Sequence, residues 1–149
     1  ERAVKAQLDE RAVENFLPTY EKISQWKDRK KLIQVPLFPG YLFVKVLFAR
    51  RLEVLKAYGA VQIVGNSTGP VPIPESQVAS VRTFVEVGLK CDPHPYLKIG
   101  KKVRIAEGPF EGLQGILVRK KNRSLFVISV EMIQRSVSVE LEGWKIAAS

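Results

Sequence analysis

The last third of the chain alternates hydrophobic and polar residues with the two-residue period of a β-strand. Residues 136–141 show the pattern most clearly, because Val137, Val139 and Leu141 are separated by polar side chains. Turn-forming segments separate this run from similar ones at residues 102–105, 116–118 and 125–130. Five expected strands between residues 97 and 149 predict a small closed β-barrel, an architecture that hides its strand edges.

The first half of the chain mixes helical and strand periods. Residues 1–12 place Val4, Leu8 and Ala12 four positions apart with charged residues between them, which predicts an amphipathic helix. The other expected elements are a strand at 15–20, a short helix at 50–56, a strand at 61–64 and a helix at 75–87. Together these patterns predict an α+β fold, in which an antiparallel N-terminal sheet with flanking helices precedes the barrel.

An apolar run at residues 41–48 follows two prolines and a glycine and is rich in β-branched and aromatic residues. It predicts a central strand whose two faces differ. One face carries Tyr41 and Phe43, whose rings need a cover that a helix of the same domain or a partner protein can supply. The other face is expected to pack a core, and it carries Leu42, Val44, Val46 and Phe48.

Residues 89–96 show no periodicity and contain two prolines, which disfavour a helix. We interpret this segment as a linker between an N-terminal domain at 1–88 and the barrel at 97–149. Cys91 and His94 have the spacing of two metal ligands, but the chain has no other cysteine or histidine to complete a site. A catalytic triad lacks a histidine for the same reason, so neither a metal centre nor an enzyme is expected.

Composition narrows the class of protein further. Hydrophobic residues make up 46% of the 149 residues, yet we find neither a membrane-spanning apolar stretch nor a secretory signal at the N-terminus. A single cysteine fits a reducing compartment. These features predict a soluble cytoplasmic protein without a membrane contact, and the net charge of +9 favours an acidic partner such as nucleic acid.

A polar and basic run at residues 26–31 interrupts the hydrophobic pattern of the N-terminal domain and predicts a hairpin tip or loop. Two interpretations stay open for its cations, namely a solvated loop and a contact with nucleic acid or with the surface of a partner. The residues concerned are Lys27, Arg29, Lys30 and Lys31.

Two motifs resemble one known family. Residues 38–41, with the sequence Phe-Pro-Gly-Tyr followed by an apolar strand, are similar to a signature of the NusG family of transcription elongation factors. Residues 100–118 resemble a KOW motif, the opening hairpin of an SH3-like barrel, and residues 129–141 extend the similarity to the last strands. Glycine fits the positions of Gly108, Gly112 and Gly115, where tight turns or close backbone approach exclude a side chain.

The resemblance implies a non-enzymatic elongation or antitermination factor that works as a monomer without a cofactor. In such a protein the N-terminal domain binds RNA polymerase, and non-template DNA or nascent RNA lies nearby. The implied polymerase-binding residues are Phe38, Pro39, Gly40, Tyr41 and Phe43, and further contacts with polymerase or nucleic acid are expected from Arg50 and Arg51. The alternative is a KOW-containing RNA-binding or ribosome-associated protein, in which recovery of polymerase would depend on RNA.

The same resemblance assigns the C-terminal barrel to the recruitment of a ribosomal protein or a termination factor. Met132 and Ile133 lie in a predicted turn, where they either face that partner or cap the barrel core. Residues 129–136 are more similar to specialised paralogues of the RfaH or UpxY type than to the general factor. Because the strand pattern and the glycines oppose a helix, we expect the barrel to keep one fold.

The chain departs from the family pattern at its beginning. Family members begin with a strand that contains a Trp-Tyr pair, whereas this sequence starts at Glu1 within the first expected helix. We expect the sequence to be a fragment, because a missing strand would leave an apolar sheet edge open.

Overall fold

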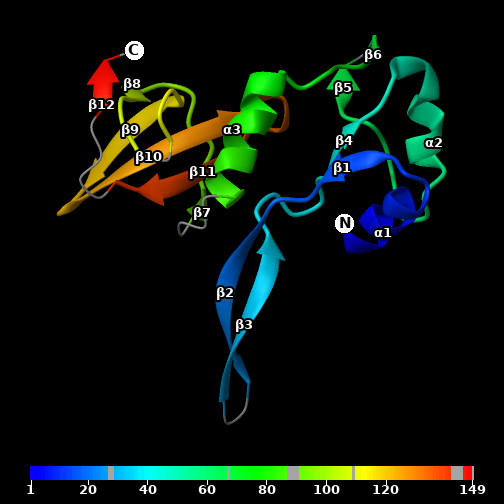
Figure 1. Cartoon of the computed structure of the whole chain (residues 1–149), viewed down its shortest axis with the longest axis horizontal. Helices are drawn as coiled ribbons and strands as arrows, with labels where there is room; N and C mark the ends of the chain where they lie inside the picture. Colours follow the sequence, from blue (N-terminus) through cyan, green and yellow to red (C-terminus); the bar gives the residue numbers. More distant parts are fainter. Residues whose placement is uncertain (27–28, 67, 87–90, 109, 142–145, 149) are drawn as a thin grey trace. The chain divides into compact units, whose positions relative to one another are not determined.

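The computed structural model describes residues 1–26, 29–66, 68–86, 91–108, 110–141 and 146–148 (Figure 1). The chain separates into two units. The first unit consists of residues 1–18 and 38–72, and the second consists of residues 19–37 and 73–149. None of the described helices is long and apolar enough to cross a membrane.

The first unit is organised around helix α1 (Arg2–Glu10), the amphipathic helix that the sequence predicts. Leu8 on its apolar stripe is fully buried in a cluster with Val13, Val54 and Ala57. Strand β1 (Glu14–Phe16) follows α1 and pairs antiparallel with β4 (Phe43–Lys45). The remaining elements are a 3-10 turn η1 (Phe48–Arg50), helix α2 (Arg51–Leu55) and the short strands β5 (Gly65–Asn66) and β6 (Gly69–Pro70).

The strand predicted at residues 41–48 is much shorter in the structure, because only Phe43–Lys45 pairs as β4. The backbone turns after Leu47, where the N–H of Arg50 donates a 2.8 Å hydrogen bond to the Leu47 carbonyl. Phe48 therefore leaves the predicted core face and is 63% exposed. The remaining aliphatic residues of that face pack against the buried cluster as predicted, and they are Leu42, Val44 and Val46.

The strand predicted at residues 61–64 does not form. These residues have no regular structure, and the carbonyl of Val64 instead accepts a 3.2 Å hydrogen bond from the N–H of Val71. That bond lies directly beside the β5–β6 pair, where Gly65 is opposite Pro70. The pairing therefore starts later in the chain than the hydrophobic pattern predicts.

The second unit contains an antiparallel sheet, which within the described residues has the order β12-β8-β9-β10-β11-β7. Strands β8 to β12 occupy the region of the five expected strands, so the predicted α+β class is confirmed. Their bounds are β8 (Lys101–Ile105), β9 (Gln114–Lys120), β10 (Arg123–Val130), β11 (Arg135–Glu140) and β12 (Ile146–Ala148).

Strand β7 (Cys91–His94) lies inside the segment that the sequence predicts as a linker. Cys91 pairs with Val139 and Pro93 pairs with Val137 of β11, on the outer side of the sheet order. Proline fits this position because an edge strand does not need every backbone N–H for the ladder. Residues 91–94 are thus a strand, while the domain boundaries at 88 and 97 stay predictions.

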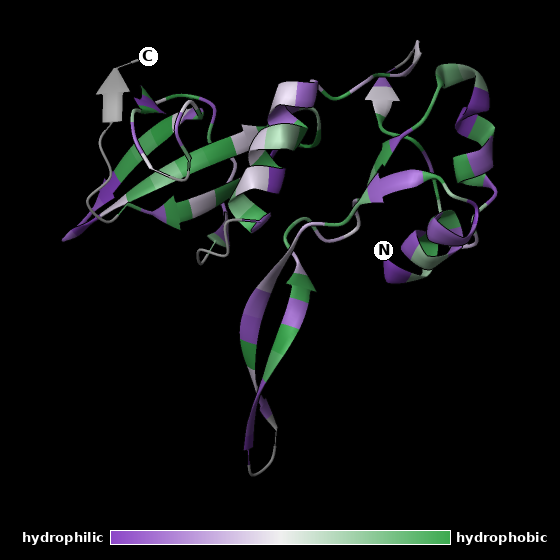
Figure 2. Cartoon of the chain, in the orientation of Figure 1, coloured by the Kyte–Doolittle hydropathy of each residue, from purple (hydrophilic) through white to green (hydrophobic). Residues whose placement is uncertain are grey.

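Helix α3 (Glu75–Glu86) confirms the helix predicted at residues 75–87 and contacts strand β10. Its Phe84 side chain is fully buried, with ring centroids 5.0 Å from Phe110 and 5.8 Å from Phe126. Hydrophobic segments of α3 and β10 are visible in Figure 2. Aromatic packing of this kind adds to the free energy gained from burying the ring area.

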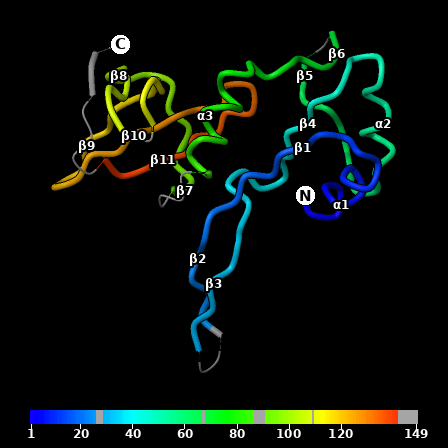
Figure 3. The backbone as a smooth tube through the Cα atoms, in the orientation of Figure 1, coloured from blue at the N-terminus to red at the C-terminus, as the bar shows by residue number. Residues whose placement is uncertain are grey.

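The second unit also contains a long hairpin of β2 (Thr19–Trp26) and β3 (Arg29–Pro36), whose two strands run side by side in the backbone trace of Figure 3. Its ladder runs from Thr19 opposite Pro36 to Trp26 opposite Arg29. The hairpin forms, but the tip or loop predicted at residues 26–31 is too long, because residue 26 and residues 29–31 belong to the paired strands. Pro18 lies between β1 and β2. Lys27, which the sequence assigns to the tip, lies outside the described residues.

Candidate interaction surfaces

The Phe-Pro-Gly-Tyr segment forms a tight turn that explains its residue types. The N–H of Tyr41 donates a 3.0 Å hydrogen bond to the carbonyl of Phe38, and Gly40 has a φ of +85°. A type II turn needs this positive φ at its third residue and favours proline at its second. The Gly40 N–H also donates to a carboxylate oxygen of Glu1 at 2.6 Å. Pro39 and Gly40 are exposed, whereas Tyr41 is half-buried.

The aromatic side chains beside this turn are mostly covered by the first unit itself. Phe38 is 1% exposed and Phe43 is 9% exposed. The Phe43 ring lies 6.0 Å from the centroid of Phe16 in a stacked arrangement and 6.0 Å from Phe38 edge-on. Of the two covers left open for the face of Tyr41 and Phe43, the structure shows one from the same domain at Phe43, although Phe16 and Phe38 provide it rather than a helix. A contact of any of the five predicted residues with polymerase stays a prediction.

The first unit instead exposes apolar side chains on η1 and α2, which sequence reasoning missed. The exposed apolar residues are Phe48, Leu52 and the preceding Leu47, and we call them, together with the half-buried Arg51, the Phe48 surface. The guanidinium of Arg51 lies 4.0 Å from the centroid of the Phe48 ring, a cation–π contact, and it donates to the Phe48 carbonyl. Phe48 and Leu52 are four residues apart, a spacing that places two side chains next to each other on a helix. A predicted helix that began earlier in the sequence would have grouped them on one surface.

The two arginines predicted to contact nucleic acid already have partners within their own segment. Arg50 forms a 2.8 Å ion pair with Glu53, and both side chains are exposed to solvent. Arg51 is engaged by Phe48. Exposed ion pairs of this kind contribute little to stability. Their placement makes Arg51 part of an apolar surface rather than part of a cationic one, and the predicted contact of both residues stays untested.

The basic run of the hairpin does not lie on one face. Lys30 is opposite Gln25, and Lys31 is opposite Ser24 on the next rung of the ladder. Successive residues of a strand point to opposite faces, so Lys30 and Lys31 point away from each other. Arg29 shares the face of Lys31, and all three cations are exposed. The ladder register therefore divides a charge run that looks uniform in sequence.

Met132 and Ile133 lie in the 3-10 turn η2 (Glu131–Ile133) between β10 and β11, as predicted. Ile133 is buried, which supports the interpretation that it caps the core, while Met132 is half-buried. The turn ends at Gln134, a residue in the left-handed region with a φ of 50°. Glu131 beside them forms a 3.6 Å ion pair with Lys98.

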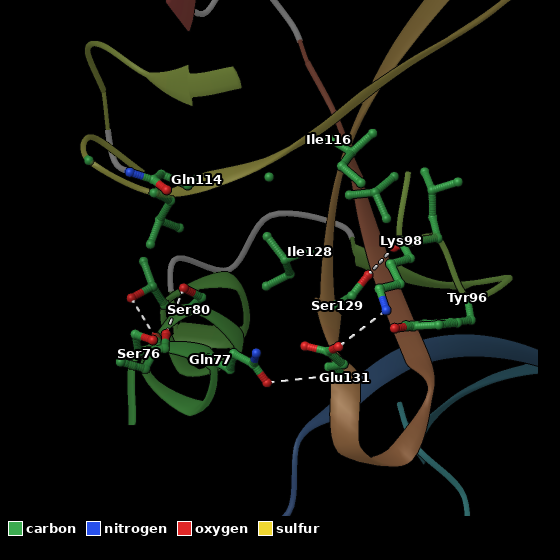
Figure 4. A pocket seen from close by; sticks show the side chains of 17 residues that line it. Ser76, Gln77, Ser80, Tyr96, Lys98, Gln114, Ile116, Ile128, Ser129 and Glu131 are labelled. Carbon is green, nitrogen blue, oxygen red and sulfur yellow. Dashed lines mark hydrogen bonds and ion pairs between the residues drawn. The ribbon is translucent and has the colours of Figure 1, made fainter. Parts of the chain in front are cut away.

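A cavity of about 650 Å³ lies between α3 and the C-terminal sheet (Figure 4). Several of its polar groups bond to other parts of the chain. The Ser80 hydroxyl donates to the carbonyl of Ser76 at 2.9 Å, and the Ser129 hydroxyl donates to the carbonyl of Leu97 at 2.8 Å. The N–H of Glu131 donates to the side chain of Gln77 at 3.4 Å, which links the turn to the helix.

Cys91 and His94 lie on β7 and do not resemble a metal centre. Burial raises the pKa of the Cys91 thiol, and the charge of Asp92 adds to this effect, so the thiol stays protonated. A metal ligand or nucleophile would need the thiolate. The Nδ1 atom of His94 lies 2.7 Å from the carbonyl of Pro95. In the described part of the chain, no three acidic, cysteine or histidine side chains form a metal-ligating group.

Comparison with known proteins identifies the family. A family model described as "Transcription termination factor nusG" matches residues 1–82. A relative named "Transcription termination/antitermination protein NusG" from Pseudomonas aeruginosa is 28% identical over 147 residues, which cover 95% of this chain and 83% of the relative. Relatives with the same name are 24% identical in Neisseria meningitidis serogroup B, with the same coverage, and 28% identical in Escherichia coli strain K12, where the match covers 87% of this chain and 74% of the relative. Because the family model spans more than half of the sequence and the relatives extend the similarity into the C-terminal sheet, this chain belongs to the NusG family.

Proposed function

We propose that the protein is a transcription elongation and antitermination factor that binds RNA polymerase through its first unit. The observation that carries this proposal is the exposed Phe48 surface, which lies within the 82 residues that match the family model. Aromatic side chains and arginine are enriched at protein interfaces, and this surface contains one of each beside exposed leucines. The named relatives support the process of termination and antitermination.

The same proposal includes recruitment of a second factor by the C-terminal sheet. The half-buried Met132 in η2 has partly accessible apolar area at a turn, whereas the side chain of Ile133 is buried. We propose that the protein works in the cytoplasm as a monomer, as a binding protein rather than an enzyme, and without a cofactor. Its chemistry then consists of forming contacts with polymerase and with the recruited protein.

Truncating the Phe48 surface is expected to weaken polymerase binding. The double substitution Phe48→Ala with Leu52→Ala should lower the affinity for purified RNA polymerase at least about thirtyfold, since a desolvated anchor contributes about 2 kcal/mol or more. Val61→Ala serves as the matched control, because Val61 is an exposed apolar residue of the same unit. Affinity should be measured after nuclease treatment. Wild-type affinity of the double variant would refute this docking surface, and recovery of polymerase only with RNA would favour an RNA-binding protein.

Separate substitutions in η2 should distinguish recruitment from core packing. Met132→Ser is expected to leave thermal unfolding nearly unchanged and to reduce capture of a ribosomal protein or termination factor. Ile133→Ser is expected to lower the free energy of unfolding by about 2–4 kcal/mol, because it removes a buried aliphatic side chain and buries a hydroxyl. Unchanged capture by a folded Met132→Ser variant would argue against a partner contact at this turn.

A further inference from the structure

The β2–β3 hairpin has two chemically different faces. Residues directly opposite each other in an antiparallel ladder share a face, and successive pairs alternate between faces. One face carries Ile23 opposite Leu32, an apolar pair that is 62% and 64% exposed. Figure 2 shows hydrophobic and hydrophilic segments alternating along this hairpin. The same face also carries Glu21 and Lys30, whereas the opposite face carries cations and no described acid, so the register separates a face of mixed charge from a basic side.

The basic side is regular. Among residues 19–26 and 29–36, three successive rungs of this face each carry one cation, namely Lys22 opposite Ile33, Lys31 opposite Ser24, and Arg29 opposite Trp26. These three side chains are exposed. We call them the cationic face. Rungs on one face lie about 7 Å apart, since a strand rises about 3.4 Å per residue, so the cations are spread along a strip roughly 14 Å long.

No described residue on the cationic face is an acid. The carboxylate of the hairpin's described strands belongs to Glu21, which is opposite Gln34 on the other face and accepts a 3.3 Å hydrogen bond from the Gln34 amide. Lys30 also points to that other face, because it is opposite Gln25. Among the described residues of the hairpin, the excess of cations over acids therefore lies on this face.

We propose that the cationic face binds the phosphate backbone of a nucleic acid strand. A nucleic acid strand carries one negative charge per nucleotide along its backbone, so a row of evenly spaced cations can contact several phosphates of one strand. A linear polyanion matches an evenly spaced row of cations better than a protein surface does, because the acidic residues of a protein surface are irregularly spaced. Contacts between cationic side chains and phosphates do not depend on the base sequence. Such a contact would therefore position a nucleic acid strand of any sequence on the protein.

This inference rests on the proposed function in one respect, because the role in transcription explains where the protein would meet a nucleic acid. The contact itself is measurable without polymerase. DNA and RNA share the phosphate chemistry, and the experiment distinguishes them by comparing the same sequence as single-stranded DNA, single-stranded RNA and duplex DNA. If the cationic face does not bind, polymerase binding through the Phe48 surface remains testable, so the two proposals fail separately.

The test measures binding of fluorescently labelled strands to the full chain at several salt concentrations. Each phosphate contact contributes about 0.9 to the slope of log affinity against log salt on duplex DNA and about 0.7 on single strands. The triple variant Lys22→Gln, Arg29→Gln, Lys31→Gln should therefore flatten the slope by roughly 2 on a single strand. Lys31→Gln alone should remove about 0.7.

Lys30→Gln is the matched control, because it makes the same change of charge at the neighbouring residue on the opposite face. It should leave the slope unchanged, and Lys31→Arg, which keeps the charge, should retain it. Equal losses for Lys30→Gln and Lys31→Gln would overturn the proposal, since they would indicate an effect of net charge alone. An unchanged slope in the triple variant, with weaker binding to polymerase, would overturn it in favour of an acidic protein surface.

Discussion

Phe84→Ala is expected to lower the free energy of unfolding of the second unit by about 3–5 kcal/mol. The ring is fully buried between the aromatic rings of Phe110 and Phe126. Truncation leaves a cavity where α3 meets the sheet and also removes the aromatic contacts. Native-state hydrogen exchange at the amides of β10 measures this loss in the full chain, because β10 is the strand that α3 contacts.

Phe48→Ala provides the comparison, because it removes the same side chain from an exposed position. Its effect on the same amides should lie within about 0.5 kcal/mol, as is usual for surface substitutions. Similar protection of β10 in both variants would mean that α3 does not pack on the sheet in solution. That outcome would agree with the predicted boundary at residue 88, which assigns the helix to the N-terminal domain.

The second large effect is expected at Gly115, where a methyl group has no room. A Cβ atom at this position would lie 2.6 Å from the carbonyl oxygen of Val127 and 2.8 Å from the ring of Phe126. Gly115→Ala should therefore force β9 away from β10 and cost about 1–3 kcal/mol or more. Urea unfolding followed by circular dichroism measures the change.

Gln114→Ala is the control for this prediction, because Gln114 precedes Gly115 in the same strand and is exposed. We expect it to change the unfolding midpoint little. If Gly115→Ala is as stable as this control, the two strands are not packed as closely as the structure has them. A stable variant that gains helical circular dichroism would contradict the expectation of a single C-terminal fold.

Elements with a strong local period were predictable from sequence. Helices α1 and α3 and the strands β8 to β11 follow patterns that a short window of residues contains. The glycine predictions also hold. Gly108 and Gly112 have φ values of +96° and +89°, which other residues adopt only under strain, and Gly115 permits close strand approach. At Gly108 and Gly112 the local backbone conformation favours glycine, whereas at Gly115 the neighbouring strand excludes a side chain.

Elements that depend on distant partners were not predictable in this way. Strand β7 forms because β11, more than forty residues further along the chain, pairs with Cys91–His94. The predicted strand at 41–48 shortens because only β1 pairs with it, and Leu47 begins a turn instead. A hydrophobic pattern reports which residues avoid water, but it does not identify the neighbour that provides the hydrogen bonds.

The candidate surfaces follow the same division. Sequence identified the Phe-Pro-Gly-Tyr segment as special, and the type II turn gives the physical reason for its proline and glycine. It could not predict that Phe16 and Phe38 cover Phe43, because that cover comes from another strand and from the turn itself. The separation of Lys30 from Lys31 likewise requires the hairpin register.

Strand β7 also bears on how the C-terminal sheet avoids unwanted association. An open sheet edge is a template for another chain, and proteins blunt such edges with proline and charge. Pro93 lacks the N–H that an incoming strand would need, and exposed Asp92 adds a negative charge beside it. A fragment that begins at residue 97 would lack this strand and uncover the edge of β11, where Val137 and Val139 lie. Such a fragment would be prone to aggregate. The edge strand β7 therefore helps to keep the sheet soluble by covering β11.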